Sequence, residues 1–434
     1  MATPAQTEEL RATVARYCRS AVSSDFTGKV AETYFTRIVV MGLALALTVI
    51  IARLLGPTGR GFYAVAAATG LLGVQFANLG MHTANAYFVA KNPQSLPYLT
   101  GNTLAVSFGF GGLVMVLLGV LFTSQPGLLN IGGATLALAL LWIPIGLAYM
   151  LLQNLMLGVQ DVRGYNLAEI GSKSLPLVLI GVLVASRRVG VATLLAATVA
   201  ALAAGAAWIT VRLWRHNPVR PQLSWPVFRS SARYALKAYL AATFCFLVLR
   251  ADLFMVQHML GAEQAGYYSI SSTMADYVSV LAAVVGTILF PRLSALADLR
   301  RKLDLTRKAT LGTALILLPL LALASVLAQP AVRLLFGEAF LPAAWSFVLL
   351  MPGMLFLGIH SVSVQFLNSI GYPVSVVIIW GLSSVFNIAV NLWAIPKYGI
   401  LGASAVSSIS YFLAFFFVMA VILRTGRRLS ESPA

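Results

Sequence analysis

Charge is the scarcest property of this 434-residue sequence. Only 10% of its residues are charged, whereas about a quarter are charged in a typical soluble protein. A chain that is 59% hydrophobic, with no charged residue between Asn92 and Gln160, lacks the polar surface that a water-soluble fold requires. We therefore expect a polytopic membrane protein.

Cysteine, acidic residues and catalytic motifs are also scarce. Two cysteines, Cys18 and Cys245, exclude a disulfide framework and a cysteine-based metal cluster. The net charge of +17 does not indicate nucleic-acid binding, because the basic residues fall between apolar runs. The sequence has no phosphate-binding G-x-x-x-x-G-K-[ST] loop, no metal-ligand cluster and no nucleophile elbow, so we expect neither an enzyme nor a cofactor.

A transmembrane helix needs about 20 apolar residues, and the sequence contains twelve such runs. Turn residues separate them, as at Gly56-Pro57-Thr58-Gly59, except between the fifth and sixth, where only Ser186-Arg187-Arg188 intervenes. The predicted spans are about 34–52, 62–90, 99–122, 134–157, 167–186, 189–211, 234–256, 265–290, 309–329, 342–369, 373–394 and 399–423.

The distribution of Lys and Arg predicts the orientation. With both termini inside, the inner segments carry 23 basic residues and the outer segments 7, so both termini are expected to be cytoplasmic. We divide the chain into an arm that includes an interfacial helix, an N-lobe, a basic connector, a C-lobe and a tail. The connector either lies on anionic lipid or is an ordinary cytoplasmic loop. These parts are 1–30, 31–211, 212–233, 234–423 and 424–434.

The two lobes share a sequence repeat. The segment RLLGPTGRGFYAV, starting at Arg53, matches HMLGAEQAGYYSI, starting at His258, at a constant offset of 205. Each copy begins on the inner side after an even number of spans, so the copies are parallel and a pseudo-two-fold axis along the membrane normal is expected. The shared positions are Leu55/Leu260, Gly56/Gly261, Gly61/Gly266 and Tyr63/Tyr268.

These segments resemble the polysaccharide-biosynthesis branch of the multidrug/oligosaccharidyl-lipid/polysaccharide (MOP) flippase superfamily. The resemblance lies in ARLLGPTGRGFYAV (52–65), in its repeat near Leu260, and in an N-x-x-x-N-x-x-x-I-P-x-x-G-I-x-G-A run that starts at Asn387. It implies an all-α, twelve-helix, MATE-like carrier in the bacterial cytoplasmic membrane, driven by an H⁺ or Na⁺ gradient without ATP. The implied cargo is a polyprenyl-pyrophosphate-linked oligosaccharide, such as an O-antigen or other polysaccharide repeat unit. A polysaccharide polymerase and glycosyltransferases are its candidate partners.

Charges within spans indicate candidate functional residues, because each costs about 2.5–3.5 kcal/mol at the bilayer centre. Asp276, in span eight, is expected either to bind the coupling ion or to pair with an arginine of the cavity. Arg37, Arg233 and Lys237 lie at the inner ends of spans one and seven, the equivalent first helices of the two lobes. They are expected to meet one pyrophosphate, with snorkelling to lipid headgroups as the alternative.

Polar residues at helical spacing suggest a cavity wall in span two. They are Gln75, Asn78, His82 and Asn85, which form one stripe on a continuous helix and favour a sugar-lined or water-lined wall over helix packing. Helix packing is the better interpretation for two other sets. These are Ser361, Gln365 and Asn368 in span ten, and Ser383, Asn387 and Asn391 in span eleven.

Two further pairs of charged residues lie within or beside the spans. Glu169 and Lys173 are four residues apart and are expected to pair with each other. Arg250 and Asp252 are two residues apart and point in different directions. They are expected to be ordinary charges at the outer rim, with outer-gate contacts as the alternative.

Two other functions remain open. A multidrug or cation exporter of the same superfamily would require an acidic or apolar cavity, whereas the cavity inferred here is cationic. A polysaccharide polymerase or ligase would normally display a large outer loop, and the outer connections of this sequence are short.

Overall fold

The computed structural model describes residues 24–216, 218, 220–371 and 373–431, and these residues form helices and turns only. Ten of the helices are long and apolar enough to cross a membrane. Two of them are merged pairs, because α2 (Ser24–Ala77) and α14 (Val374–Glu431) each contain a glycine at which the chain reverses. Counting both halves of each pair confirms the twelve predicted transmembrane helices.

The reversals depend on glycine. Gly56 has φ 67° and ψ −178°, and Gly399 has φ 63° and ψ −148°. Residues with a Cβ adopt this region of conformational space only with strain.

The N-lobe contains the first six crossings, two of which are divided. The second crossing is broken before α3, and the third consists of α4 and α5 joined by a π-helical turn, η2. The elements that follow α2 are α3 (Met81–Lys91), η1 (Pro93–Ser95), α4 (Leu96–Ala105), η2 (Val106–Phe110), α5 (Gly111–Ser124), η3 (Pro126–Leu128), α6 (Gly133–Gly158), α7 (Val162–Ala185) and α8 (Val191–His216).

The C-lobe contains the other six crossings and one short additional helix, α12. Its elements are α9 (Trp225–Leu260), α10 (Ala262–Ala295), α11 (Leu299–Val326), α12 (Ala328–Phe336), η4 (Glu338–Phe340), α13 (Pro342–Ser369) and α14.

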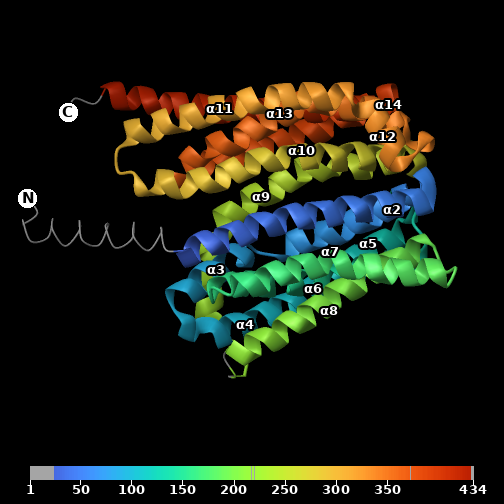
Figure 1. The fold of residues 1–434 in the computed structure, drawn as a ribbon, viewed down its shortest axis with the longest axis horizontal. Coiled ribbons are helices and arrows are strands. Elements are labelled where there is room, and N and C mark those ends of the chain that lie inside the picture. Colours follow the sequence, from blue (N-terminus) through green and yellow to red (C-terminus); the bar gives the residue numbers. More distant parts are fainter. Residues whose placement is uncertain (1–23, 217, 219, 372, 432–434) are drawn as a thin grey trace, which may run out of the picture.

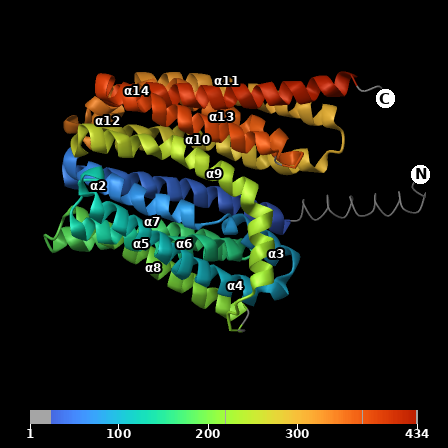
Figure 2. The same ribbon diagram turned by 180° about the vertical axis from the view of Figure 1, so that it is seen from behind.

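The two lobes lie side by side, and α9 runs obliquely from one to the other (Figures 1 and 2). The start of α2 and the end of α14 lie at one end of the bundle, which we call the basic side. The reversal in α2 and helix α12 lie at the opposite end, which we call the far side. Parallel lobes with both chain ends on one side are the arrangement that the repeat predicts.

Small residues allow the helices of the N-lobe to pack closely. A Cβ on Gly70 would come within 2.8 Å of the Trp142 ring, and one on Gly73 within 2.3 Å of Ile143. Helix α6 therefore packs directly against the backbone of α2, as is common where no hydrophobic effect drives association.

The connector is shorter than predicted and is folded against the N-lobe. Helix α8 extends to His216 and α9 begins at Trp225, so helices occupy most of 212–233. Asn102 of α4 donates to Ser224 O (2.9 Å) and accepts from Ser224 N (3.0 Å). The backbone of Gln222 donates to Pro97 O at 3.1 Å.

The predicted ends of the chain are covered only in part. The arm 1–30 lies largely outside the described residues, and α2 already begins at Ser24. Of the tail 424–434, residues up to Glu431 continue α14 as a helix.

Candidate functional site

The far side of the bundle is closed by a backbone contact between the repeated segments. A Cβ on Gly61 of α2 would lie 1.8 Å from Ala262 O of α10, and one on Gly266 of α10 would lie 2.0 Å from Pro57 O of α2. Because Pro57 and Ala262 are also 205 residues apart, the contact is pseudo-symmetric. The two lobes therefore interlock at their far ends through positions where only glycine fits.

Side chains at equivalent positions reinforce this far-side closure. Arg53, at the end of the first crossing, donates to Leu335 O (2.7 Å) and Leu334 O (2.5 Å) at the end of α12 in the C-lobe. Its repeat counterpart His258 contacts Gly127 O of the N-lobe through Nδ1 at 3.1 Å. Gln257 of the C-lobe also donates to Leu129 O of the N-lobe at 3.0 Å. Both lobes thus extend side chains to backbone carbonyls of the other, a role that sequence analysis did not predict for these residues.

On the basic side, α9 connects the lobes. Tyr239 of α9 donates to Phe76 O at 2.8 Å, and Gln75 of α2 donates to Thr243 of α9 at 3.1 Å. Within the described part of the chain, the other hydrogen bonds between the lobes on this side come from the connector. The lobes are therefore interlocked by α2 and α10 at one end and linked through α9 at the other.

The three cations predicted to meet one pyrophosphate, which we call the phosphate clamp, lie on two helices, α2 and α9. Arg37 is half-exposed and donates to Glu169 of α7 at 3.3 Å. Glu169, for which Lys173 was the expected partner, forms this ion pair with Arg37. Arg233 and Lys237 are exposed on α9 and form no ion pair with any residue that the structure describes.

Asp276 pairs with an arginine, which is one of the two roles predicted for it. Its carboxylate accepts from Arg250 of α9 at 2.6 Å, with both side chains about one-third exposed. The prediction that Arg250 is an ordinary rim charge is therefore wrong.

A second cation lies closer to the far-side closure. Arg60, adjacent to the interlocked Gly61, is 93% buried, with its guanidinium 5.7 Å from the centre of the Tyr63 ring. Its Nε has no hydrogen-bond partner among the described residues. Arg60 is one of the seven basic residues assigned to the outer segments from the sequence, so its burial was not predicted. The helix that restarts at Pro57 could have indicated this burial. The chain turns back into the bundle there, and Arg60 lies within the first turn of that helix.

The predicted stripe of span two is not continuous, because the helix breaks at residues 78–80. Leu79 and Gly80 have positive φ, and α3 begins only at Met81. The Asn78 side chain contacts His82 across this break, with Oδ1 accepting from the His82 backbone at 3.3 Å and the amide 2.8 Å from Nδ1. The stripe as one helical face is therefore wrong.

Asn85 packs within the N-lobe. It is fully buried and donates to Thr103 at 2.8 Å and to Leu151 O at 3.2 Å. Of the four stripe residues, Gln75 alone donates to a helix of the other lobe.

Asp252 is the centre of a polar network that the sequence did not predict. It is 1% exposed and accepts from Tyr268, from Ser407 at 2.8 Å and from Leu253 N at 2.8 Å. Ser407 also lies 3.5 Å from Asn387, which accepts from Asn391. The rim prediction for Asp252 is therefore wrong, whereas helix packing of the asparagines is confirmed.

Comparison with known proteins identifies the family of this chain. A family model described as "Polysaccharide biosynthesis protein" matches residues 50–345, more than half of the chain. The chain belongs to the polysaccharide biosynthesis protein family. This confirms the resemblance that the repeated segments suggested.

Individual relatives agree with this assignment. A putative O-antigen transporter of Shigella flexneri is 24% identical over 163 residues, which is 37% of this chain and 39% of that protein. The chain spans less than two-fifths of the length of the curated relatives that it matches.

Solved structures share the fold at low identity. An inward-facing multidrug resistance MATE family transporter of the MOP superfamily superposes with a TM-score of 0.73 at 14% identity, over 90% of this chain and 96% of that one. The lipid II flippase MurJ, in an inward closed conformation, superposes with a TM-score of 0.67 at 16% identity, over 91% and 87%. These similarities confirm the MATE-like fold of a polysaccharide-biosynthesis family member.

Proposed function

We propose that this protein is a flippase that moves a polyprenyl-pyrophosphate-linked oligosaccharide from the cytoplasmic to the outer leaflet of a bacterial cytoplasmic membrane. The observation that carries the proposal is the arrangement of the two lobes in this polysaccharide-biosynthesis family member. Parallel lobes are interlocked by glycines at the far side, while exposed cations lie at the basic-side ends of their equivalent first helices. Taking the basic side as cytoplasmic agrees with the positive-inside bias of the sequence.

Under this proposal, the cargo's diphosphate meets Arg37 and Arg233 in the cytoplasmic leaflet, with Lys237 beside them. Arg37 is half-exposed, and Glu169 holds its guanidinium in place. The buried Arg60 offers a further positive charge near the far-side closure. Release to the outer leaflet then requires the Gly61 and Gly266 contact to open.

The sign of the available charge argues against a cation exporter. Three carboxylates within the spans are already engaged, because Glu169 accepts from Arg37, Asp276 from Arg250, and Asp252 from three donors. In the observed state each of the three has partners, whereas Arg233 and Lys237 are exposed. An anionic cargo fits this distribution better.

We further propose that an H⁺ or Na⁺ gradient drives the cycle through Asp276. Its ion pair with Arg250 joins α9, which links the lobes, to α10, which forms the far-side closure. Protonation of Asp276 or binding of a cation to it would release Arg250, so an ion could change how these two helices pack.

The test is a double replacement, Arg37→Gln with Arg233→Gln, in a strain that depends on this protein. We expect the lipid-linked glycan to accumulate in the cytoplasmic leaflet, measured by mass spectrometry of extracted lipids together with its accessibility to added lectin. The matched control is Arg187→Gln with Arg188→Gln, which removes two exposed arginines on the far side. Equal flipping by both double variants would exclude the clamp, and an unchanged glycolipid pool in a deletion strain would exclude the flippase function itself.

A further inference from the structure

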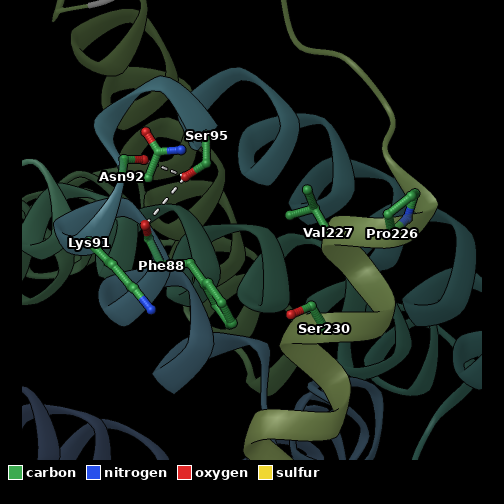
Figure 3. Close-up of a pocket in the computed structure, with 7 residues that line it drawn as sticks. All are labelled: Phe88, Lys91, Asn92, Ser95, Pro226, Val227 and Ser230. Carbon is green, nitrogen blue, oxygen red and sulfur yellow. Dashed lines mark hydrogen bonds between the residues drawn. The ribbon is translucent and has the colours of Figure 1, made fainter.

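A cavity of about 480 Å³ opens on the basic side, between the turn that follows α3 and the first turns of α9 (Figure 3). Phe88 and Lys91 lie on one wall, and Val227 and Ser230 lie on the other. The cavity is therefore built by the N-lobe and by the helix that links the lobes.

The polar groups of the lining are hydrogen-bonding groups and one cation, set among the apolar side chains of Phe88, Pro226 and Val227. Lys91 has its ammonium 5.9 Å from the centre of the Tyr87 ring. Ser230 brings a hydroxyl group, and Asn92 brings a side-chain amide whose oxygen already accepts from Gln94 N at 3.1 Å, which leaves its NH2 group to donate. The Ser95 hydroxyl already donates to Asn92 O at 2.6 Å. No carboxylate lines the cavity. Such a set suits a phosphate oxygen, which accepts hydrogen bonds and carries negative charge.

The surrounding sequence keeps acidic residues away. The segments 33–160 and 170–251 contain no Asp or Glu, and both walls of the cavity come from these segments. Arg229 and Arg233 are exposed on the same turns of α9. The local field around the cavity is therefore positive.

Aromatic and apolar side chains beside the cavity are exposed. Tyr87 and Tyr234 stack with ring centres 4.6 Å apart and are 42% and 50% exposed, and Leu223 and Trp225 are 73% and 69% exposed. Tyr and Trp rings next to basic residues are typical of the membrane interface, where apolar ring faces meet lipid chains. A ligand with both a phosphate and acyl chains matches this combination.

We propose that this cavity binds the phosphate headgroup of an anionic glycerophospholipid of the leaflet on the basic side. The phosphate accepts from Lys91, the Ser230 hydroxyl and the Asn92 amide, and the acyl chains lie along the exposed aromatic rings. Because α3 and α9 form opposite walls, a bound lipid ties the base of α9 to the N-lobe and stabilises the arrangement observed here.

The test uses the purified full-length protein in nanodiscs of phosphatidylcholine, alone or mixed with phosphatidylglycerol. We expect phosphatidylglycerol to raise the unfolding temperature and to remain bound in native mass spectrometry. Lys91→Gln should weaken this binding about fivefold, as expected for the loss of one lysine near an anionic surface. Ser230→Phe, which fills the cavity, should abolish retention of the lipid.

Lys397→Gln is the matched control, because Lys397 also lies over aromatic rings, at 5.1 Å from Trp393 and 5.2 Å from Tyr398, away from the cavity. Equal loss of phosphatidylglycerol binding in the Lys91 and Lys397 variants would overturn the assignment. Stabilisation by inorganic phosphate equal to that by phosphatidylglycerol would show a phosphate site without lipid selectivity and would also overturn it. The readout does not depend on transport, so its outcome is separate from that of the flippase proposal.

Discussion

The far-side closure can be opened by a single methyl group. A Cβ on Gly266 would lie 2.0 Å from Pro57 O, whereas ordinary contacts of this kind lie at 3.4–4 Å. In Gly266→Ala the backbones of α2 and α10 must therefore separate by about 1.4 Å to reach 3.4 Å at this point. Overpacking of this kind typically costs about 1–3 kcal/mol, which shifts the equilibrium away from the closed state by about 5- to 150-fold.

Distances between the lobes measure this shift directly. With spin labels at Asn130 in the N-lobe and Glu338 in the C-lobe, both near the far side, Gly266→Ala should move the distance distribution to longer values. Gly61→Ala should do the same, because its Cβ meets Ala262 O from the other lobe. Gly312→Ala is the control, since a Cβ there meets nothing within 4 Å. If all three variants gave the wild-type distribution, the glycine interlock would not be what holds the far side closed.

Two further predictions concern polar contacts. Asp252→Asn should lower the free energy of unfolding by about 1–3 kcal/mol, because an amide leaves one of three buried donors unpaired, whereas Asp276→Asn, in a partly exposed pair, should cost less than about 1 kcal/mol. Unfolding in detergent compares them, and equal losses would contradict the difference in burial. Asn102→Ala should free the connector by removing both hydrogen bonds to Ser224, each worth about 1 kcal/mol, and so speed chymotryptic cleavage after Leu223, which is 73% exposed. Unchanged cleavage would show that the connector is held elsewhere.

The sequence predicted the crossings and the duplication because both are locally encoded. Hydropathy over about 20 residues depends on the bilayer and not on neighbouring helices. The reversal at Gly56 needs a backbone conformation that one residue type supplies, and Gly261 repeats it with φ 88° and ψ 177°. The short boundary between the fifth and sixth crossings is also local. Arg187 adopts a positive φ there, and this reverses the chain between α7 and α8.

Polar contacts were harder to predict because they depend on which helix lies opposite. Asp252 and Arg250 are two residues apart, yet Asp252 accepts from Tyr268 of α10 and from Ser407 of α14, whereas Arg250 donates to Asp276, two turns further along α10. Helical spacing across Asn78 implied one face, but the break that follows it redirects the chain before His82. No local pattern records such choices, so the candidate site required the three-dimensional arrangement.

The duplication also shows where the two lobes have diverged. Tyr63 pairs with the hydroxyl of Thr198 at 3.0 Å, whereas its counterpart Tyr268 donates to the carboxylate of Asp252. At an offset of 205, Asp252 and Asp276 correspond to Leu47 and Leu71, so the carboxylates of these crossings occur in the C-lobe copy alone. Under the proposed ion coupling, the driving cation needs a carboxylate within the bundle. In these crossings such groups belong to α9 and α10, the helices that contact the N-lobe, and movement of an ion there would therefore act directly on the contact between the lobes.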